Sequence, residues 1–166
     1  PGRHEMRNTE VLVIQPDALC PPALIGEALH RRGITLRVVN TDAGDPFPED
    51  PFSFAGLLML GGRQSLLDEA QTTFVDTVTG IVRAYHKSER PILGSCLGAK
   101  LAAAAFCARV RRVGELQFGF VPLQRTGDGT DPLVSAMPDG QRVFTWHEDF
   151  SDIPPGAVPL LATDTV

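Results

Sequence analysis

The sequence predicts an α/β fold in which helices alternate with the strands of a mainly parallel central sheet. Four short apolar runs recur along the first part of the chain, each followed by turn residues; they span 10–15, 35–39, 55–60 and 91–93. Stretches with the apolar spacing of helices lie between most of these runs. Continuous apolar character is typical of strands whose two faces are both covered, as parallel strands between helices are.

Proline, glycine and apolar spacing locate the helices of this region. Pro21 and Pro22 suit the first turn of a helix, and Gly33 suits its C-terminal end. The acidic, proline-rich segment 42–54 predicts a loop. A longer helix is expected over 69–86, because apolar residues recur along it with helical spacing. Its apolar face is formed by Phe74, Val75, Val78, Ile81, Val82 and Tyr85.

Beyond the helix that follows 91–93, the pattern changes to short strands and turns. The expected strands span 110–113, 118–123, 142–146 and 157–162, with turns at 127–129 and 154–156. His147 is expected in a loop directly after one of these strands. Because no repeat, low-complexity tract or linker interrupts the chain, we expect residues 1–166 to form a single domain.

The composition disfavours several classes of binding partner and cofactor. A formal net charge of -5 and an isoelectric point near 5.3 disfavour nucleic acid and anionic membranes, and no apolar run has the length of a membrane span. The three cysteines, Cys20, Cys96 and Cys107, are widely spaced and show no zinc-binding pattern. We therefore expect no metal, no cofactor and a cytoplasmic location. Cys20 is expected in a loop, and Cys107 is expected to pack late on a helix.

The segment 93–99 predicts a site of chemistry. Its sequence, Leu-Gly-Ser-Cys-Leu-Gly-Ala, follows a strand and precedes a helix, which makes it the cysteine version of the Gly-x-Ser-x-Gly nucleophile elbow. In so tight a turn the nucleophile has a strained backbone, and the residues two before and two after it must lack side chains. The thiol of Cys96 would project at a helix N-terminus, which stabilises a thiolate and a developing oxyanion. The alternative is a buried packing cysteine.

A glycine pair, Gly61 and Gly62, follows the strand at 55–60. In parallel sheets, sites lie beyond the carboxyl ends of the strands, so we expect this pair and Cys96 at the same edge. A glycine there can present a bare backbone N–H to a neighbouring reaction centre. The pair does not match a phosphate-binding loop.

With these segments the chain resembles the class I glutamine amidotransferases, especially the stand-alone GMP-synthase-like members. The matching segments are 60–62, 93–99, 113–116, 146–149 and 153–157. The resemblance implies a flavodoxin-like three-layer sandwich and a Cys-His-Glu triad that hydrolyses the glutamine side-chain amide through a γ-glutamyl thioester. It implies that Cys96 is the nucleophile and that the backbone N–H groups of Gly62 and Leu97 form the oxyanion hole.

The chain departs from the family pattern in three places. The family's catalytic histidine and glutamate lie on a His-Pro-Glu segment downstream of the Trp-His loop, and we expect the domain at 1–166 to lack this segment. Lys100 stands where the elbow helix usually has glutamine, and Gln117 stands where glycine is expected. Gly61, Lys100 and Gln117 are the candidates for substrate contacts. Lys100 either stabilises a thiolate at Cys96 or is a surface lysine.

The sequence thus predicts cysteine-dependent hydrolysis of the glutamine side-chain amide. One alternative is hydrolysis of another γ-glutamyl compound, because Lys100 and Gln117 would reshape the pocket. The other alternative is a catalytically inactive amidotransferase-like domain that binds a small metabolite or a partner. The expected partners are a small-molecule substrate and either a synthetase that receives ammonia or a second copy of the chain.

Overall fold

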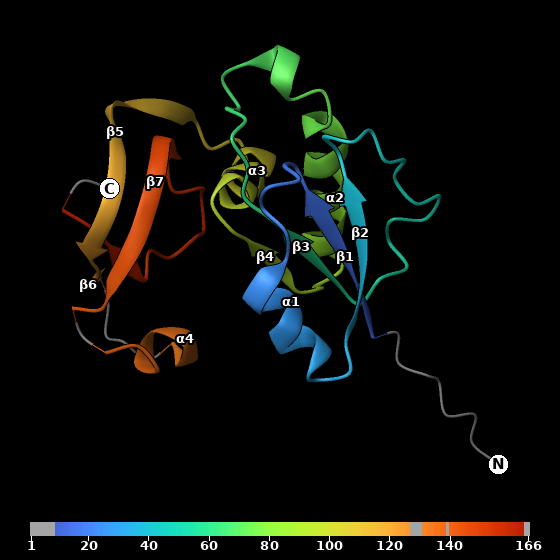
Figure 1. Cartoon of the computed structure of the whole chain (residues 1–166), viewed down its shortest axis with the longest axis horizontal. Helices are drawn as coiled ribbons and strands as arrows, with labels where there is room; N and C mark the ends of the chain where they lie inside the picture. The colour runs from blue at the N-terminus through green and yellow to red at the C-terminus, as the bar shows by residue number, and fades with distance from the viewer. Residues whose placement is uncertain (1–8, 127–130, 139, 165–166) are drawn as a thin grey trace. The chain divides into compact units, whose positions relative to one another are not determined.

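The computed structural model describes residues 9–126, 131–138 and 140–164. Contacts within the chain divide it into two compact units, the first ending at Phe106 and the second beginning at Cys107. Figure 1 follows the chain from the N-terminus in blue to the C-terminus in red. In the described part of the chain, no helix combines the length and the apolar character that a membrane crossing requires.

The first unit is built on a four-stranded sheet in which every pair of neighbouring strands is parallel. The strands are β1 (Glu10–Gln15), β2 (Thr35–Asn40), β3 (Gly56–Met59) and β4 (Ile92–Gly94), and they lie in the order β2-β1-β3-β4. The four strands predicted from the apolar runs are therefore confirmed. Because the strands are parallel, the loops that follow them all leave from one edge of the sheet.

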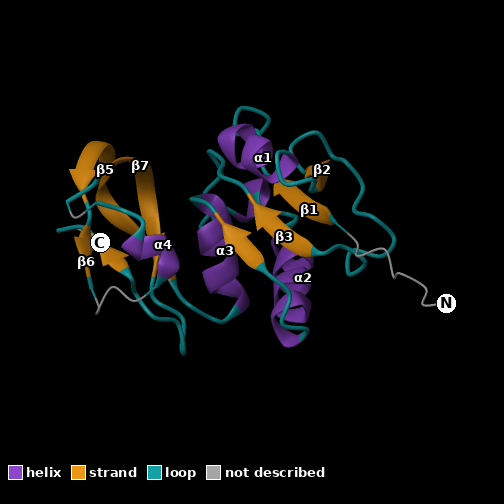
Figure 2. Cartoon of the chain, turned by 90° about the horizontal axis from the view of Figure 1, so that it is seen from below, coloured by secondary structure: helices purple, strands orange, loops and turns teal. Residues whose placement is uncertain are grey.

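Helices cover both faces of this sheet and make three layers. Helix α1 (Ala23–His30) covers one face, and α2 (Val75–Lys87) and α3 (Leu97–Ala105) cover the other (Figure 2). On the α1 side, Ile25 and Leu29 pack against buried strand residues such as Val13 and Leu58. The opposite core is larger, and its buried members include Leu12, Ile14, Met59, Val78, Val82, Tyr85, Leu97 and Leu101. The predicted α/β fold with its three-layer sandwich is confirmed.

The long helix expected over 69–86 is divided. A short 3-10 turn, η1 (Glu69–Gln71), comes first, and α2 begins only at Val75. The Asp68 side chain accepts a hydrogen bond from the backbone N–H of Ala70, and the hydroxyl of Thr72 donates to the Asp68 carbonyl. These local bonds compete with helix formation at this point. The predicted apolar face is confirmed, since Val78, Ile81, Val82 and Tyr85 are buried.

The second unit is built from antiparallel pairs. Strand β5 (Val110–Pro122) pairs with β7 (Arg142–Ser151), and β6 (Gln124–Arg125) pairs with β8 (Leu161–Ala162); a short helix, α4 (Pro132–Ser135), lies between β6 and β7 in sequence. The strands expected at 110–113 and 118–123 are one strand, whose register shifts between Arg112 and Gln117. Gly114 has a φ of 96° in this irregular stretch.

The structure differs from two of the expectations for the second unit, confirms a third and does not describe the residues of a fourth. Strand β7 continues past Trp146 through His147, so the loop expected there is wrong: backbone pairing with β5 extends the strand to Ser151. The final strand is shorter than 157–162, because Pro159 has no N–H to donate to a ladder. The turn at 154–156 is confirmed by the bond from the Ala157 N–H to the Pro154 carbonyl. The turn expected at 127–129 lies outside the described residues.

Candidate active site

Cys96 occupies a strained turn between β4 and α3. Its backbone has φ 53° and ψ -111°, a conformation that residues with a side chain rarely adopt. The preceding Ser95 donates its backbone N–H to the carbonyl of Met59 at 2.9 Å, which ties the turn to β3. The strand, sharp turn and helix of the predicted elbow are therefore present. The side chain of Cys96 is exposed, so the alternative of a buried packing cysteine is wrong.

The two elbow glycines are required by close approach of backbone to backbone. A Cβ at Gly94 would lie 2.6 Å from the carbonyl carbon of Gly98 and 2.8 Å from the nitrogen of Ala99. A Cβ at Gly98 would lie 2.6 Å from the carbonyl carbon of Met59. Helix α3 therefore starts in direct contact with the backbone of β3. This contact holds the N-terminus of α3 behind Cys96.

The glycine pair after β3 lies beside the elbow. A Cβ at Gly61 would lie 3.4 Å from the Cβ of Cys96, and a Cβ at Gly62 would lie 3.1 Å from the Cδ2 of Leu97. The first N–H groups of an α-helix have no acceptor within the helix, and Leu97 is the first residue of α3. Gly61 thus lies beside Cys96, and Gly62 lies beside the first residue of α3.

An ion pair that the sequence analysis did not predict holds the loop after β3 in place. Asp17 follows β1 and its side chain is fully buried. Its carboxylate accepts the Nε–H of Arg63 at 2.6 Å, the Nη2–H at 3.2 Å, and the backbone N–H groups of Arg63 and Leu19 at 3.1 and 2.9 Å. The loop after β1 is therefore bonded to the residue directly after Gly62. The sequence does hold a signal for this ion pair: Asp17 and Arg63 each come shortly after the end of a buried strand.

Hydrogen bonds from the Arg63 side chain hold the pKa of Asp17 down to about 2, from an ordinary value of 3.8. Burial opposes this shift, and the backbone N–H groups of Leu19 and Arg63 add to it. The folded state thus stabilises the charged form of Asp17 more than the unfolded chain does. A depressed pKa contributes stability that is present above the unfolded value and is lost as the pH falls through the folded one.

We expect the Asp17 carboxylate to stabilise the fold by about 2 kcal/mol above about pH 4 and to lose this contribution as the pH falls toward 2. The measurement is urea unfolding of the wild type and Asp17→Asn across this range. The other titrating groups are common to both proteins, so the difference in unfolding free energy isolates Asp17. A difference that stayed constant from about pH 5 to pH 2 would contradict the prediction.

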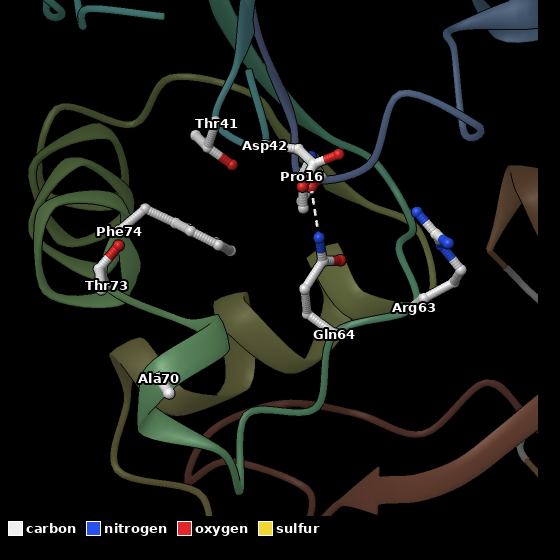
Figure 3. Close-up of a pocket in the computed structure, with 8 residues that line it drawn as sticks. All are labelled: Pro16, Thr41, Asp42, Arg63, Gln64, Ala70, Thr73 and Phe74. Atoms are coloured by element: carbon white, nitrogen blue, oxygen red, sulfur yellow. Dashed lines mark hydrogen bonds between the residues drawn. The ribbon is translucent and has the colours of Figure 1, made fainter. Parts of the chain in front are cut away.

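A pocket of about 440 Å³ opens at the carboxyl ends of β1 and β2. Its lining includes Thr41, Asp42, Arg63, Gln64 and Phe74, and Figure 3 shows the Gln64 side chain reaching Pro16 with Phe74 projecting toward it. The Nε2 of Gln64 donates to the carbonyl of Pro16 at 2.7 Å. Its Oε1 and the hydroxyl of Thr41 are buried without a hydrogen-bond partner among the described residues. Cys96 does not line this pocket, so the pocket and the thiol are separate features of the same edge.

The model of the family "Glutamine amidotransferase class-I" matches residues 23–165. The chain belongs to this family. Among solved structures, a glutamine amidotransferase from Methylobacillus flagellatus is 28% identical with a TM-score of 0.85, over 95% of this chain and 63% of that one. A glutamine amidotransferase from Thermotoga maritima is 22% identical with a TM-score of 0.83, over 94% of this chain and 67% of that one.

A third structure has the same fold at lower identity. It is a putative GMP synthase subunit from Thermoplasma acidophilum, 18% identical with a TM-score of 0.72, over 94% of this chain and 73% of that one. The chain spans between 63% and 73% of the length of these three proteins. No curated protein sequence matches the chain.

The structure places the other candidate residues in two groups. Gly61, Gly62, Leu97 and Lys100 surround the turn at Cys96; Lys100 is half-buried on α3 and its N–H donates to the Cys96 carbonyl at 3.3 Å. Gln117 belongs to the second unit. There its Oε1 is joined to the Nε2 of His147 by a hydrogen bond of 2.9 Å.

Neither described histidine of the first unit lies at the carboxyl edge of the sheet. His30 ends α1 and His86 lies in the last turn of α2, and both are exposed. Each of these helices returns the chain to the start of the next strand, so its C-terminus lies at the opposite edge from Cys96. Cys107 was expected to pack on α3, but it is exposed and follows the helix with a φ of 62°. The helix ends at Ala105, and the backbone of the next residue, Phe106, is no longer helical, with φ -111°.

Proposed function

We propose that the chain provides the glutaminase chemistry of an amidotransferase, with Cys96 as the nucleophile. The observation that carries this proposal is the exposed thiol on a strained turn, at the N-terminus of α3 and beside Gly61. A strained backbone persists only where the surroundings enforce it, and such positions cluster at active sites. Here the contact between the backbones of Gly98 and Met59 enforces it.

In the proposed reaction, the Cys96 thiolate attacks the side-chain amide carbon of glutamine. The carbonyl oxygen becomes an oxyanion, which the backbone N–H groups of Gly62 and Leu97 stabilise. Collapse of this intermediate breaks the C–N bond; the leaving nitrogen takes a proton and departs as ammonia, and a γ-glutamyl thioester stays on Cys96. Water then attacks the thioester carbon and releases glutamate and the thiol.

Proton transfer in these steps needs a general base close to the thiol. The family resemblance assigns this role to a histidine, oriented by a glutamate, on a His-Pro-Glu segment that residues 1–166 do not include. We propose that both units belong to one catalytic domain, which such a segment would complete. Gly61 and Lys100 would contact the substrate beside the thiol. The proposed protein partner is either a synthetase in the cytoplasm, which would receive the ammonia, or further copies of the same chain in an oligomer.

The chloroketone analogue of glutamine, in which a chloromethyl group replaces the amide nitrogen, tests the nucleophile. The thiolate displaces chloride, and the sulfur keeps the analogue as a thioether. We expect the analogue to label Cys96 selectively and free glutamine to protect it, with peptide mass mapping as the readout. Cys20 and Cys107 in the same chain serve as internal controls. Equal labelling of all three cysteines, or labelling that glutamine does not slow, would overturn the assignment.

One observation favours a second candidate, hydrolysis of another γ-glutamyl compound. Lys100 is half-buried one helical turn after Cys96, where its ammonium would attract a substrate that carries a further negative charge. A panel of γ-glutamyl amines and peptides, compared with glutamine in the same ammonia or amine release assay, separates the two. A clear preference for glutamine would remove this candidate.

A further inference from the structure

Two cysteines far apart in the sequence meet at Gly61. The position that a Cβ would occupy on Gly61 is 3.9 Å from the Sγ of Cys96 and 4.0 Å from the Sγ of Cys20. Cys20 follows β1 and Cys96 follows β4, and β3, which ends just before Gly61, lies between these strands in the sheet. Because glycine has no side chain, no Gly61 atom occupies this position, which is close to both sulfur atoms.

We propose that Cys20 and Cys96 form a reversible disulfide that blocks the candidate nucleophile. The inference rests on the proposed function for its consequence, the loss of activity, while the cross-link itself depends only on the position of the two thiols. Both sulfur atoms lie within 4.0 Å of one point beside Gly61, so the two thiols are close enough for small movements of side chain and loop to join them.

The oxidant is a hydroperoxide such as hydrogen peroxide. The Cys96 thiolate attacks one peroxide oxygen, the O–O bond breaks, and hydroxide leaves and is protonated to water; the Cys96 sulfur is oxidised by two electrons to a sulfenic acid. The Cys20 sulfur then attacks the Cys96 sulfur and forms the S–S bond. The hydroxyl group of the sulfenic acid leaves with the proton of the Cys20 thiol as a second water.

The surroundings of the two thiols set this order of events. Cys96 is exposed at the N-terminal end of α3, so a peroxide can reach its sulfur. Burial raises the pKa of Cys20, and the charges of Asp17 and Cys96 raise it further, so Cys20 is the less reactive thiol.

Cys107 provides a matched control, because it is exposed like Cys96 but follows the C-terminal end of α3. The nine residues of α3 separate it from the thiol at the N-terminal end of the same helix, a length that a side chain cannot span. A disulfide that formed merely because thiols are exposed would involve Cys107 as readily as Cys20.

In the experiment, the wild-type protein and the variants Cys20→Ser and Cys107→Ser are treated with hydrogen peroxide. Their peptides are then identified by mass with the disulfides left unreduced. In the wild type and in Cys107→Ser we expect a peptide pair joined through Cys20 and Cys96, lighter by two hydrogen atoms and separated by a thiol reductant. In Cys20→Ser we expect no such pair; instead, a cyclic 1,3-diketone should trap the sulfenic acid on Cys96.

Two results would overturn the proposal. One is a cross-link to Cys107 that forms as readily as the link between Cys20 and Cys96. The other is diketone trapping of Cys96 to the same extent in the wild type and in Cys20→Ser, since an effective partner thiol must compete with the trap. Neither readout uses glutamine, so the two proposals can fail separately. Failure of chloroketone labelling would contradict the proposed function but not the disulfide, and absence of the cross-link would contradict the disulfide but not the proposed function.

Discussion

Replacing Gly98 by alanine is expected to destabilise the fold by about 3 kcal/mol or more, because the added methyl group meets backbone. The new Cβ would lie 2.6 Å from the carbonyl carbon of Met59 and 2.7 Å from the Met59 Cβ. Met59 ends β3, whose residues are buried, so the strand has little room to yield. Helix α3 would have to move away from the sheet and take the Cys96 turn with it.

Gly80→Ala is the matched control for this prediction. Gly80 lies inside α2, and a Cβ built there meets nothing within 4 Å. Alanine in a helix interior is favoured over glycine by about 0.5–1 kcal/mol, so this variant should be more stable than the wild type. Urea unfolding of the three proteins gives the comparison. If Gly98→Ala unfolded at the urea concentration of the wild type, the proposed contact between α3 and β3 would be wrong.

Replacing Cys96 by alanine is expected to reduce ammonia release from glutamine on the order of a thousandfold or more, because no thioester can form. The assay uses the native chain with the His-Pro-Glu segment that the proposal requires. Stability should change little, since the side chain of Cys96 is exposed. Unfolding measurements on the same preparations distinguish loss of chemistry from loss of fold.

Cys107→Ala is the control for the activity measurement. It removes a second exposed cysteine and should release ammonia at the rate of the wild type. Release by Cys96→Ala at that same rate would end the nucleophile assignment. A comparable loss in both variants would point to a general effect of removing a thiol rather than to an elbow nucleophile.

The parallel sheet and its helices could be predicted because their signals are local. Continuous apolar runs mark β1 and β3, and the apolar spacing of Val78, Ile81, Val82 and Tyr85 marks the buried face of α2. The second unit was harder to predict. Its strand ends depend on pairing: the partner strand β5 extends β7 through His147 to Ser151, and nothing in the local residues of β7 signals this.

By itself, the sequence determined the turn at Cys96, because only glycine tolerates the backbone contacts that the strand, the turn and α3 make at positions 94 and 98. Only the tertiary structure decided what surrounds that turn. Asp17 reaches Arg63 across 46 positions of sequence, and Cys20 approaches Cys96 because the loops after β1 and β4 leave the sheet at one edge. Such neighbours have no sequence periodicity, since the order of the strands in the sheet brings them together.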